Sequence, residues 1–305
     1  MAFTAKDVQK LREMTGVGMM DCKKALEASG GDMDKAVEWL REKGLAASQK
    51  KASRIAAEGM AYADVFGSVG VIVEVNSETD FVAKNDKFVS FVKGVAETIA
   101  RVNPKDLDAL MEAKYLDTDN TVAQQQQEMV LVIGENIKIR RFARFDDGIS
   151  VPYVHAGGKI SVLVNLSVSE GLEDKVVELG KDLAMQIAAL NPAYLDKSQV
   201  DEETLNKERE ILTVQAKNDP KNANKPDAII EKMVTGRLSK FFKDSCLMQQ
   251  EFVKDDSVTV EQHIARVAKE LGGTITLTKA VRYEKGEGIE KKADNFAEEV
   301  ANMVK

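Results

Sequence analysis

A predicted strand gives way to a predicted helix at Thr79-Asp80-Phe81-Val82-Ala83-Lys84-Asn85-Asp86. The strand covers residues 69–76, and the helix begins at an Asn85/Asp86 cap before apolar residues at helical spacing. Phe81 therefore falls on the connector, between the charged residues Asp80 and Lys84. Connectors on a rigid scaffold are where binding residues concentrate, so we predict that Phe81 is an interface anchor. The alternative is that Phe81 folds back as a core residue.

An internal repeat in the sequence helps to decide whether Phe81 is an interface anchor or a core residue. Sliding the sequence by 88 positions aligns residues 86–104 with residues 174–192, and nine of the nineteen positions are identical. The preceding strands also correspond, Val73-Glu74-Val75-Asn76 with Val162-Leu163-Val164-Asn165. The pattern predicts two copies of a strand, connector and helix.

The connectors of the two copies differ. The first reads Glu78-Thr79-Asp80-Phe81-Val82, whereas the second reads Ser167-Val168-Ser169-Glu170-Gly171 and is one residue shorter. If packing required an aromatic residue here, the second copy should keep one. Its absence favours the interpretation of Phe81 as a binding residue.

The N-terminal region, residues 1–54, is predicted to be a three-helix bundle and a linker. Thr4 begins the first helix, the second covers about residues 19–28, and Asp32 caps a third that stops at Gly44. Residues 45–57 form a basic, helical link with no core of its own.

The remainder predicts an α+β fold with antiparallel sheets. We expect one core subdomain at residues 55–147, with a hairpin at 60–75 and a strand at 137–145 whose arginines lie on its solvent face. A second subdomain covers residues 148–284 and contains a helical-hairpin, coiled-coil insertion at about 198–247, broken at 218–226. Residues 285–305 form a C-terminal helical module.

Composition narrows the class of function. The 305 residues carry a net charge of −7 and a pI near 5.2, which argues against nucleic acid as the main partner. Two cysteines, Cys22 and Cys246, indicate neither a disulfide framework nor a thiolate metal site. Without an 18-residue apolar run or a signal pattern, we expect a cytoplasmic protein with no membrane partner.

Enzyme motifs are missing from the sequence. Gly157-Gly158-Lys159 lacks the upstream glycine and the following hydroxyl of a P-loop, and no Gly-x-Ser-x-Gly is present. The two histidines, His155 and His263, are too few for a histidine-based metal site. We therefore expect no enzyme activity, no cofactor and no metal, and a novel enzyme is the weaker hypothesis.

Two long motifs carry a family resemblance. The connector Thr79-Asp80-Phe81-Val82-Ala83-Lys84-Asn85-Asp86 and Leu11-Arg12-Glu13-Met14-Thr15-Gly16-Val17-Gly18-Met19-Met20-Asp21-Cys22-Lys23-Lys24-Ala25-Leu26 closely resemble the bacterial elongation factor Ts family. The resemblance covers essentially the whole chain. It implies a guanine-nucleotide exchange factor for the translational GTPase elongation factor Tu, with a ubiquitin-associated-like N-terminal bundle.

The resemblance also assigns site residues. It implies that Thr79, Asp80, Phe81 and Val82 form a wedge that displaces Mg²⁺ and loosens phosphate contacts in the partner. Arg12, Met19 and Met20 would contact the partner's nucleotide domain. His155 would contact the partner from the second copy, which would hold the partner's other domains. From the residues alone, Met19 and Met20 could both complete the bundle core, and His155 could be structural.

The expected partner is elongation factor Tu in its GDP-bound and nucleotide-free states, and a homodimer of such heterodimers is also open. The resemblance further implies that the C-terminal module touches the partner. The competing hypothesis is an adaptor or scaffold that binds partners through its N-terminal bundle.

Overall fold

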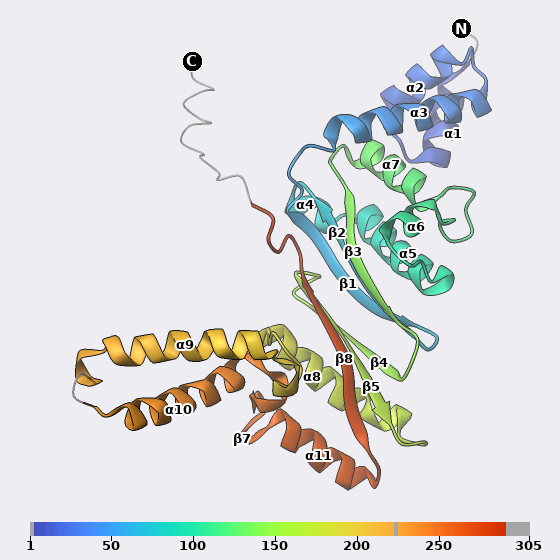
Figure 1. The fold of residues 1–305 in the computed structure, drawn as a ribbon. Coiled ribbons are helices and arrows are strands. Elements are labelled where there is room, and N and C mark those ends of the chain that lie inside the picture. Colours follow the sequence, from blue (N-terminus) through green and yellow to red (C-terminus); the bar gives the residue numbers. More distant parts are fainter. Residues whose placement is uncertain (1–2, 223–224, 291–305) are drawn as a thin grey trace.

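The computed structural model describes residues 3–222 and 225–290 and begins with three packed helices (Figure 1). They are α1 (Ala5–Thr15), α2 (Met19–Ala28) and α3 (Met33–Lys51). Thr4 caps α1 in a capping box with Asp7, and Asp32 caps α3 by accepting a hydrogen bond from the Lys35 N–H. The bundle core is apolar and includes Leu11, Cys22, Leu26 and Leu40. The predicted three-helix bundle is thus confirmed.

The third helix is longer than predicted, because Gly44 does not end it. Residues 45–51 contain good helix formers and no proline, so α3 continues to Lys51. Gly44 lies where α3 crosses α7 (Val122–Ile133), and a Cβ there would come within 3.4 Å of the Gln127 carbonyl oxygen. The glycine therefore lies inside α3 at its contact with α7, not at the end of the helix.

Two three-stranded antiparallel sheets form the centre of the molecule (Figure 1). The first has the order β1 (Glu58–Phe66), β2 (Val69–Ser77) and β3 (Lys138–Phe145). The second has the order β4 (Ile149–His155), β5 (Ile160–Val168) and β8 (Ile275–Glu284). The sheets pack face to face, with Ala63, Ile72 and Leu163 between them and a hydrogen bond of 2.8 Å from the Ser161 hydroxyl to the Ala61 carbonyl oxygen.

Each sheet is covered on its other face by the helix of its own copy. Strand alternation directs Val71, Val73 and Val75 toward α5 (Asp86–Val102), while Ile72 faces the second sheet. Likewise Val162, Val164 and Leu166 pack with α8 (Val177–Leu190). The core is therefore a four-layer arrangement of helix, sheet, sheet and helix.

The duplication extends to the backbone at the ends of these helices. Asn103 ends α5 with φ 47°, and Asn191 ends α8 with φ 45°. Their N–H groups donate to the carbonyl oxygens of Ile99 and Ile187, which are also equivalent in the repeat. Asparagine tolerates this left-handed conformation better than most residues, so both copies end in the same way.

The expectation that the arginines of β3 lie on its solvent face is wrong, because the side chains of Arg140, Arg141 and Arg144 are only 26%, 32% and 14% exposed. The ladder between β2 and β3 shifts register at Glu74/Val75, where Glu74 pairs with Arg141 and Val75 with Ile139. Arg140 is the extra residue of this bulge, so two successive arginines reach the same buried carboxylate of Glu74. Local alternation fails where a bulge is present.

The predicted helical hairpin is present in the second copy and projects away from the sheets (Figure 1). Helices α9 (Glu202–Asn218) and α10 (Asp227–Ser245) share a small core of Leu212, Ala216, Ile230 and Val234. The other elements are short or complete the two copies: α4 (Asp80–Ala83), α6 (Leu107–Glu112), η1 (Glu173–Val176), η2 (Lys197–Gln199), η3 (Pro220–Asn222), η4 (Leu247–Gln249), β6 (Glu251–Phe252), β7 (Asp255–Thr259) and α11 (Val260–Leu271).

Most of the predicted C-terminal helical module, residues 291–305, lies outside the described residues. Within residues 3–222 and 225–290, no helix is both long and apolar enough to cross a membrane.

Candidate functional site

The connector after β2 forms a single helical turn, α4, with two faces of opposite character. Thr79 has an extended conformation just before α4, and Asp80 and Phe81 are the first two residues of α4. The Phe81 side chain is 82% exposed, whereas Val82 is only 7% exposed and belongs to the core cluster beneath it. The structure therefore excludes the alternative that Phe81 is a core residue.

The turn is held at both of its ends. At its start, the Glu135 carboxylate accepts hydrogen bonds from the Thr79 N–H (3.0 Å) and the Thr79 hydroxyl (2.7 Å). At its end, the Asn85 N–H donates to the Val82 carbonyl oxygen (2.9 Å), and the Asn85 side chain caps α5, as predicted, by accepting hydrogen bonds from the Lys87 N–H (2.9 Å) and the Phe88 N–H (3.4 Å). Phe81 thus stands on a fixed support, which lowers the entropy lost when it binds.

The bundle presents a second apolar surface. Met19 is 43% exposed and Met20 is 62% exposed, and Arg12 is also exposed. Neither methionine completes the bundle core, because Cys22 and Leu26 fill it. An exposed methionine is a flexible, polarizable contact residue, so both positions suit an interface.

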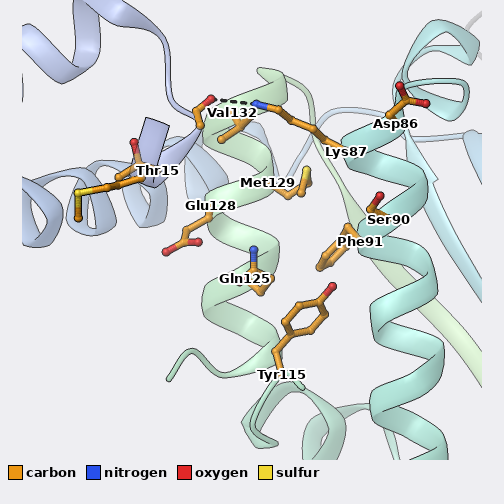
Figure 2. A pocket seen from close by; sticks show the side chains of 12 residues that line it. Thr15, Asp86, Lys87, Ser90, Phe91, Tyr115, Gln125, Glu128, Met129 and Val132 are labelled. Carbon is orange, nitrogen blue, oxygen red and sulfur yellow. Dashed lines mark hydrogen bonds between the residues drawn. The ribbon is translucent and has the colours of Figure 1, made fainter. Parts of the chain in front are cut away.

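A groove separates the α1–α2 turn from α5 and α7 (Figure 2). At its rim, the Lys87 ammonium donates a hydrogen bond of 3.1 Å to the Gly16 carbonyl oxygen. Tyr115 lies deeper, where burial and the negative charge of Glu97 raise its pKa to about 12. The Lys87 contact connects the bundle to the helix that directly follows Phe81.

His155 lies at the end of β4 and is exposed. Its Nδ1 is 3.1 Å from the Tyr153 hydroxyl, and the two rings stack with centroids 5.9 Å apart. The following turn rests on β1, because the Ala61 N–H donates to the Gly158 carbonyl oxygen (2.8 Å). Since α4 also packs against β1, both α4 and the turn after His155 contact this strand.

Comparisons with known proteins identify the family. The family model described as Elongation factor TS matches residues 78–287. A protein from Syntrophotalea carbinolica named elongation factor Ts is 47% identical over 307 residues, covering 100% of both chains. Another, from Clostridium novyi, is 50% identical over 306 residues and covers 99% of this chain and 98% of its own.

The chain belongs to the elongation factor Ts family. Elongation factor Ts is a nucleotide exchange factor for elongation factor Tu and catalyses no covalent chemistry, and family membership supports that role here. Residues 3–222 and 225–290 contain no group of three or more His, Cys, Asp or Glu side chains that could hold a metal ion.

Sequence reasoning missed three residues of the site. Glu135 supports α4, Lys87 contacts the bundle, and Met14 is 58% exposed on the bundle surface. Glu135 is 56 positions from Thr79, so no local pattern links them. The one available signal is that Glu135 follows Gly134, a glycine that ends α7 shortly before β3.

Proposed function

We propose that this protein accelerates GDP release from elongation factor Tu by inserting α4 against the partner's nucleotide domain. A P-loop GTPase holds GDP through backbone donors around the phosphates and through Mg²⁺. Thr79, Asp80 and Phe81 would displace the groups that support Mg²⁺ and phosphate. Val82 would act from below, by anchoring the turn in the core.

The observation that carries the proposal is the exposure of Phe81 on a support fixed at both ends. A large aromatic residue that is 82% exposed contributes little to folding, and its rigid mount favours an interface role. No catalytic side chain is needed. By linkage, a factor that weakens GDP binding is itself bound more weakly when GDP is present, by the same ratio.

Arg12, Met19 and Met20 would grip the same domain of the partner, and His155 would add a contact from the second copy. The exposure of both methionines supports this assignment. The Lys87–Gly16 hydrogen bond keeps the bundle surface and α4 on one connected frame.

The size of the Phe81 contribution follows from its area. Burying a whole phenylalanine removes about 150–250 Å² from water. With 82% of Phe81 exposed, about 120–200 Å² remains to be buried, for an upper bound of about 3–5 kcal/mol. Association costs reduce the expected loss to about 2–4 kcal/mol, which is about one and a half to three decades in exchange rate.

The experiment is release of a fluorescent GDP analogue from elongation factor Tu, in Mg²⁺ and in EDTA, with wild type and Phe81→Ala. We expect wild type to accelerate release in Mg²⁺, a smaller acceleration in EDTA, and a loss of about one and a half to three decades in Phe81→Ala. Val102→Ala is the control, because Val102 is also an exposed apolar residue (43%) but ends α5.

Each outcome has a meaning for the proposal. A Phe81→Ala variant with normal exchange refutes the assignment of Phe81. A wild-type protein that binds the partner without accelerating release supports the adaptor instead. An unfolded Phe81→Ala variant, by circular dichroism, would also contradict the assignment, because it would make Phe81 a packing residue.

A further inference from the structure

We infer that Glu135 is a positioning residue for nucleotide exchange: its carboxylate fixes the start of α4 so that Phe81 is presented to the partner. This inference rests on the proposed function of Phe81. It adds a residue that touches neither nucleotide nor metal and that acts through the position of another side chain.

Three hydrogen bonds converge on the Glu135 carboxylate. One oxygen accepts from the backbone N–H groups of Glu78 (3.1 Å) and Thr79 (3.0 Å), and the other accepts from the Thr79 hydroxyl (2.7 Å). Hydrogen bonds to an ionised carboxylate are about twice as strong as neutral ones. Because all three donors belong to the last two residues before α4, the carboxylate sets the direction in which the turn leaves β2.

The two segments exchange hydrogen bonds in both directions, which also fixes the position of Glu135. The Glu78 carboxylate accepts a hydrogen bond of 2.6 Å from the Asn136 N–H, so each segment supplies a carboxylate to the backbone of the other. Asn136 is 8% exposed, and its side chain donates to the Arg54 carbonyl oxygen (2.8 Å). Two short segments, 78–79 and 134–136, are thereby locked together.

The segment at residues 134–136 also contacts the end of the helix that carries the N-terminal bundle. The Lys51 ammonium, at the end of α3, donates a hydrogen bond of 2.6 Å to the Gly134 carbonyl oxygen. Arg54 lies 3.5 Å from the Glu78 carboxylate. The helix that carries the bundle therefore ends on the segment that holds α4, through contacts that do not involve the Glu135 side chain.

The second copy serves as an internal comparison. Gly272 ends α11 with φ 73°, as Gly134 ends α7 with φ 88°, and each precedes a strand that pairs with the central strand of its sheet. The residue after the glycine is Glu135 in the first copy and Gly273 in the second. Gly273 therefore marks the position at which the second copy lacks the carboxylate.

The second connector is held by other contacts. Ser169 bonds directly to Thr274 through backbone and hydroxyl groups, and Leu172 is only 6% exposed. A Cβ on Gly273 would lie 2.7 Å from Leu172 Cδ1, so a larger side chain at this position would require the neighbouring side chains to shift. The carboxylate and the projecting aromatic residue thus occur together in one copy, and both are missing from the other.

The test measures GDP-analogue release from elongation factor Tu over a range of factor concentrations, using the full chain. We expect Glu135→Ala to lower the maximal rate about tenfold, about 1.4 kcal/mol at 25 °C, and to change the half-saturating concentration less than about threefold. The bundle contacts are untouched, so binding is largely kept. Amide hydrogen exchange at Thr79 should become faster, because its acceptor is gone.

Two variants control for a merely structural role. Glu135→Gln keeps one acceptor oxygen and the side-chain size, so it should restore at least part of the maximal rate. Asp106→Ala removes a carboxylate that accepts a backbone hydrogen bond (Ala109 N–H, 2.8 Å) at the start of α6, and it should leave exchange unchanged. If Glu135→Ala does not fold, Thr79→Val removes the hydroxyl donor alone at nearly constant volume.

The double variant Phe81→Ala/Glu135→Ala decides the mechanism. If Glu135 acts through Phe81, the double variant is no slower than Phe81→Ala by more than about twofold. A double variant that shows the product of the two losses overturns the inference, as does Glu135→Ala with a normal maximal rate beside a slow Phe81→Ala. A normal rate in Phe81→Ala itself overturns the proposed function and this inference together.

Discussion

Replacing Glu74 should destabilise the junction between the first sheet and the end of β8. Glu74 lies within β2 with no exposed surface. Its carboxylate accepts hydrogen bonds from Asn76 Nδ2 (3.0 Å), an Arg140 guanidinium nitrogen (3.0 Å), Arg141 Nε (2.6 Å) and the Gly286 N–H (2.8 Å). Two arginines of the first sheet and a residue beyond β8 therefore meet at one buried charge.

The magnitude follows from what each substitution leaves behind. Removing one partner of a buried ion pair costs about 3–5 kcal/mol. Arg141 keeps a second carboxylate, Glu287, at 2.9 Å, so we expect Glu74→Ala to cost about 3 kcal/mol, the low end of that range. Glu74→Gln should cost about 1–3 kcal/mol, because one of its two terminal atoms becomes a donor facing a donor.

The pH dependence has a definite sign. Burial alone would raise the pKa of Glu74, but the hydrogen bonds from Gly286, Asn76, Arg140 and Arg141 outweigh burial and lower it below the ordinary 4.5. A carboxyl group with a lower pKa in the folded state stabilises the fold above its unfolded pKa, and the contribution is lost as pH falls toward the folded value. The stability gap between wild type and Glu74→Gln should therefore be full at pH 7 and should shrink below about pH 4.5.

The assay is urea unfolding followed by far-UV circular dichroism at pH 7, 5.5 and 4. The only tryptophan, Trp39, belongs to the N-terminal bundle, so its fluorescence shows whether the bundle unfolds separately. Glu97→Gln is the control, because Glu97 makes an exposed ion pair with Arg101 on α5, and such pairs contribute little. A Glu74→Ala variant as stable as this control, or a gap that widens in acid, would refute the reasoning.

Two further predictions concern the bundle surface and the turn after His155. Met19→Ala and Met20→Ala should weaken binding of nucleotide-free elongation factor Tu, measured by calorimetry, by about 0.6–1.3 and about 0.9–1.9 kcal/mol. These values scale the free energy of burying a methionine by the exposed fractions of 43% and 62%, and neither variant should lower the melting temperature. An affinity equal to that of wild type would show that the bundle is not part of the interface. Gly158→Ala should lower the free energy of unfolding, measured by thermal unfolding, by about 1–3 kcal/mol, because φ is 92° and a Cβ would lie 2.6 Å from Met60 Cγ. Gly157→Ala should cost less, because φ is 65° and a Cβ there would meet open space. The reverse order would contradict the packing argument.

Local sequence patterns predict much of the fold. Apolar spacing predicted the helices and strands, since a helix or strand must turn one face toward a core wherever it packs. The 88-residue repeat predicted two equivalent copies, and the left-handed Asn103 and Asn191 show that the equivalence extends to single backbone positions. The exposure of Phe81 was also predictable, because the second copy lacks an aromatic residue at that point.

What the sequence did not determine is where distant segments meet. Gly44 was predicted to end a helix, because a glycine that ends a helix and one inside a helix at a contact with another cannot be told apart before α7 is placed beside it. Arg140 and Arg141 resembled solvent-facing residues, because a bulge that turns both toward Glu74 has no local signature. Glu135 carried no signal except that it follows Gly134, since its role depends on donors 56 and 57 positions away. The periodicity of side chains is set by the geometry of a single helix or strand, so the sequence by itself determines where helices and strands form. A contact between charged side chains depends on how those helices and strands pack, so only the tertiary structure decides which charges meet.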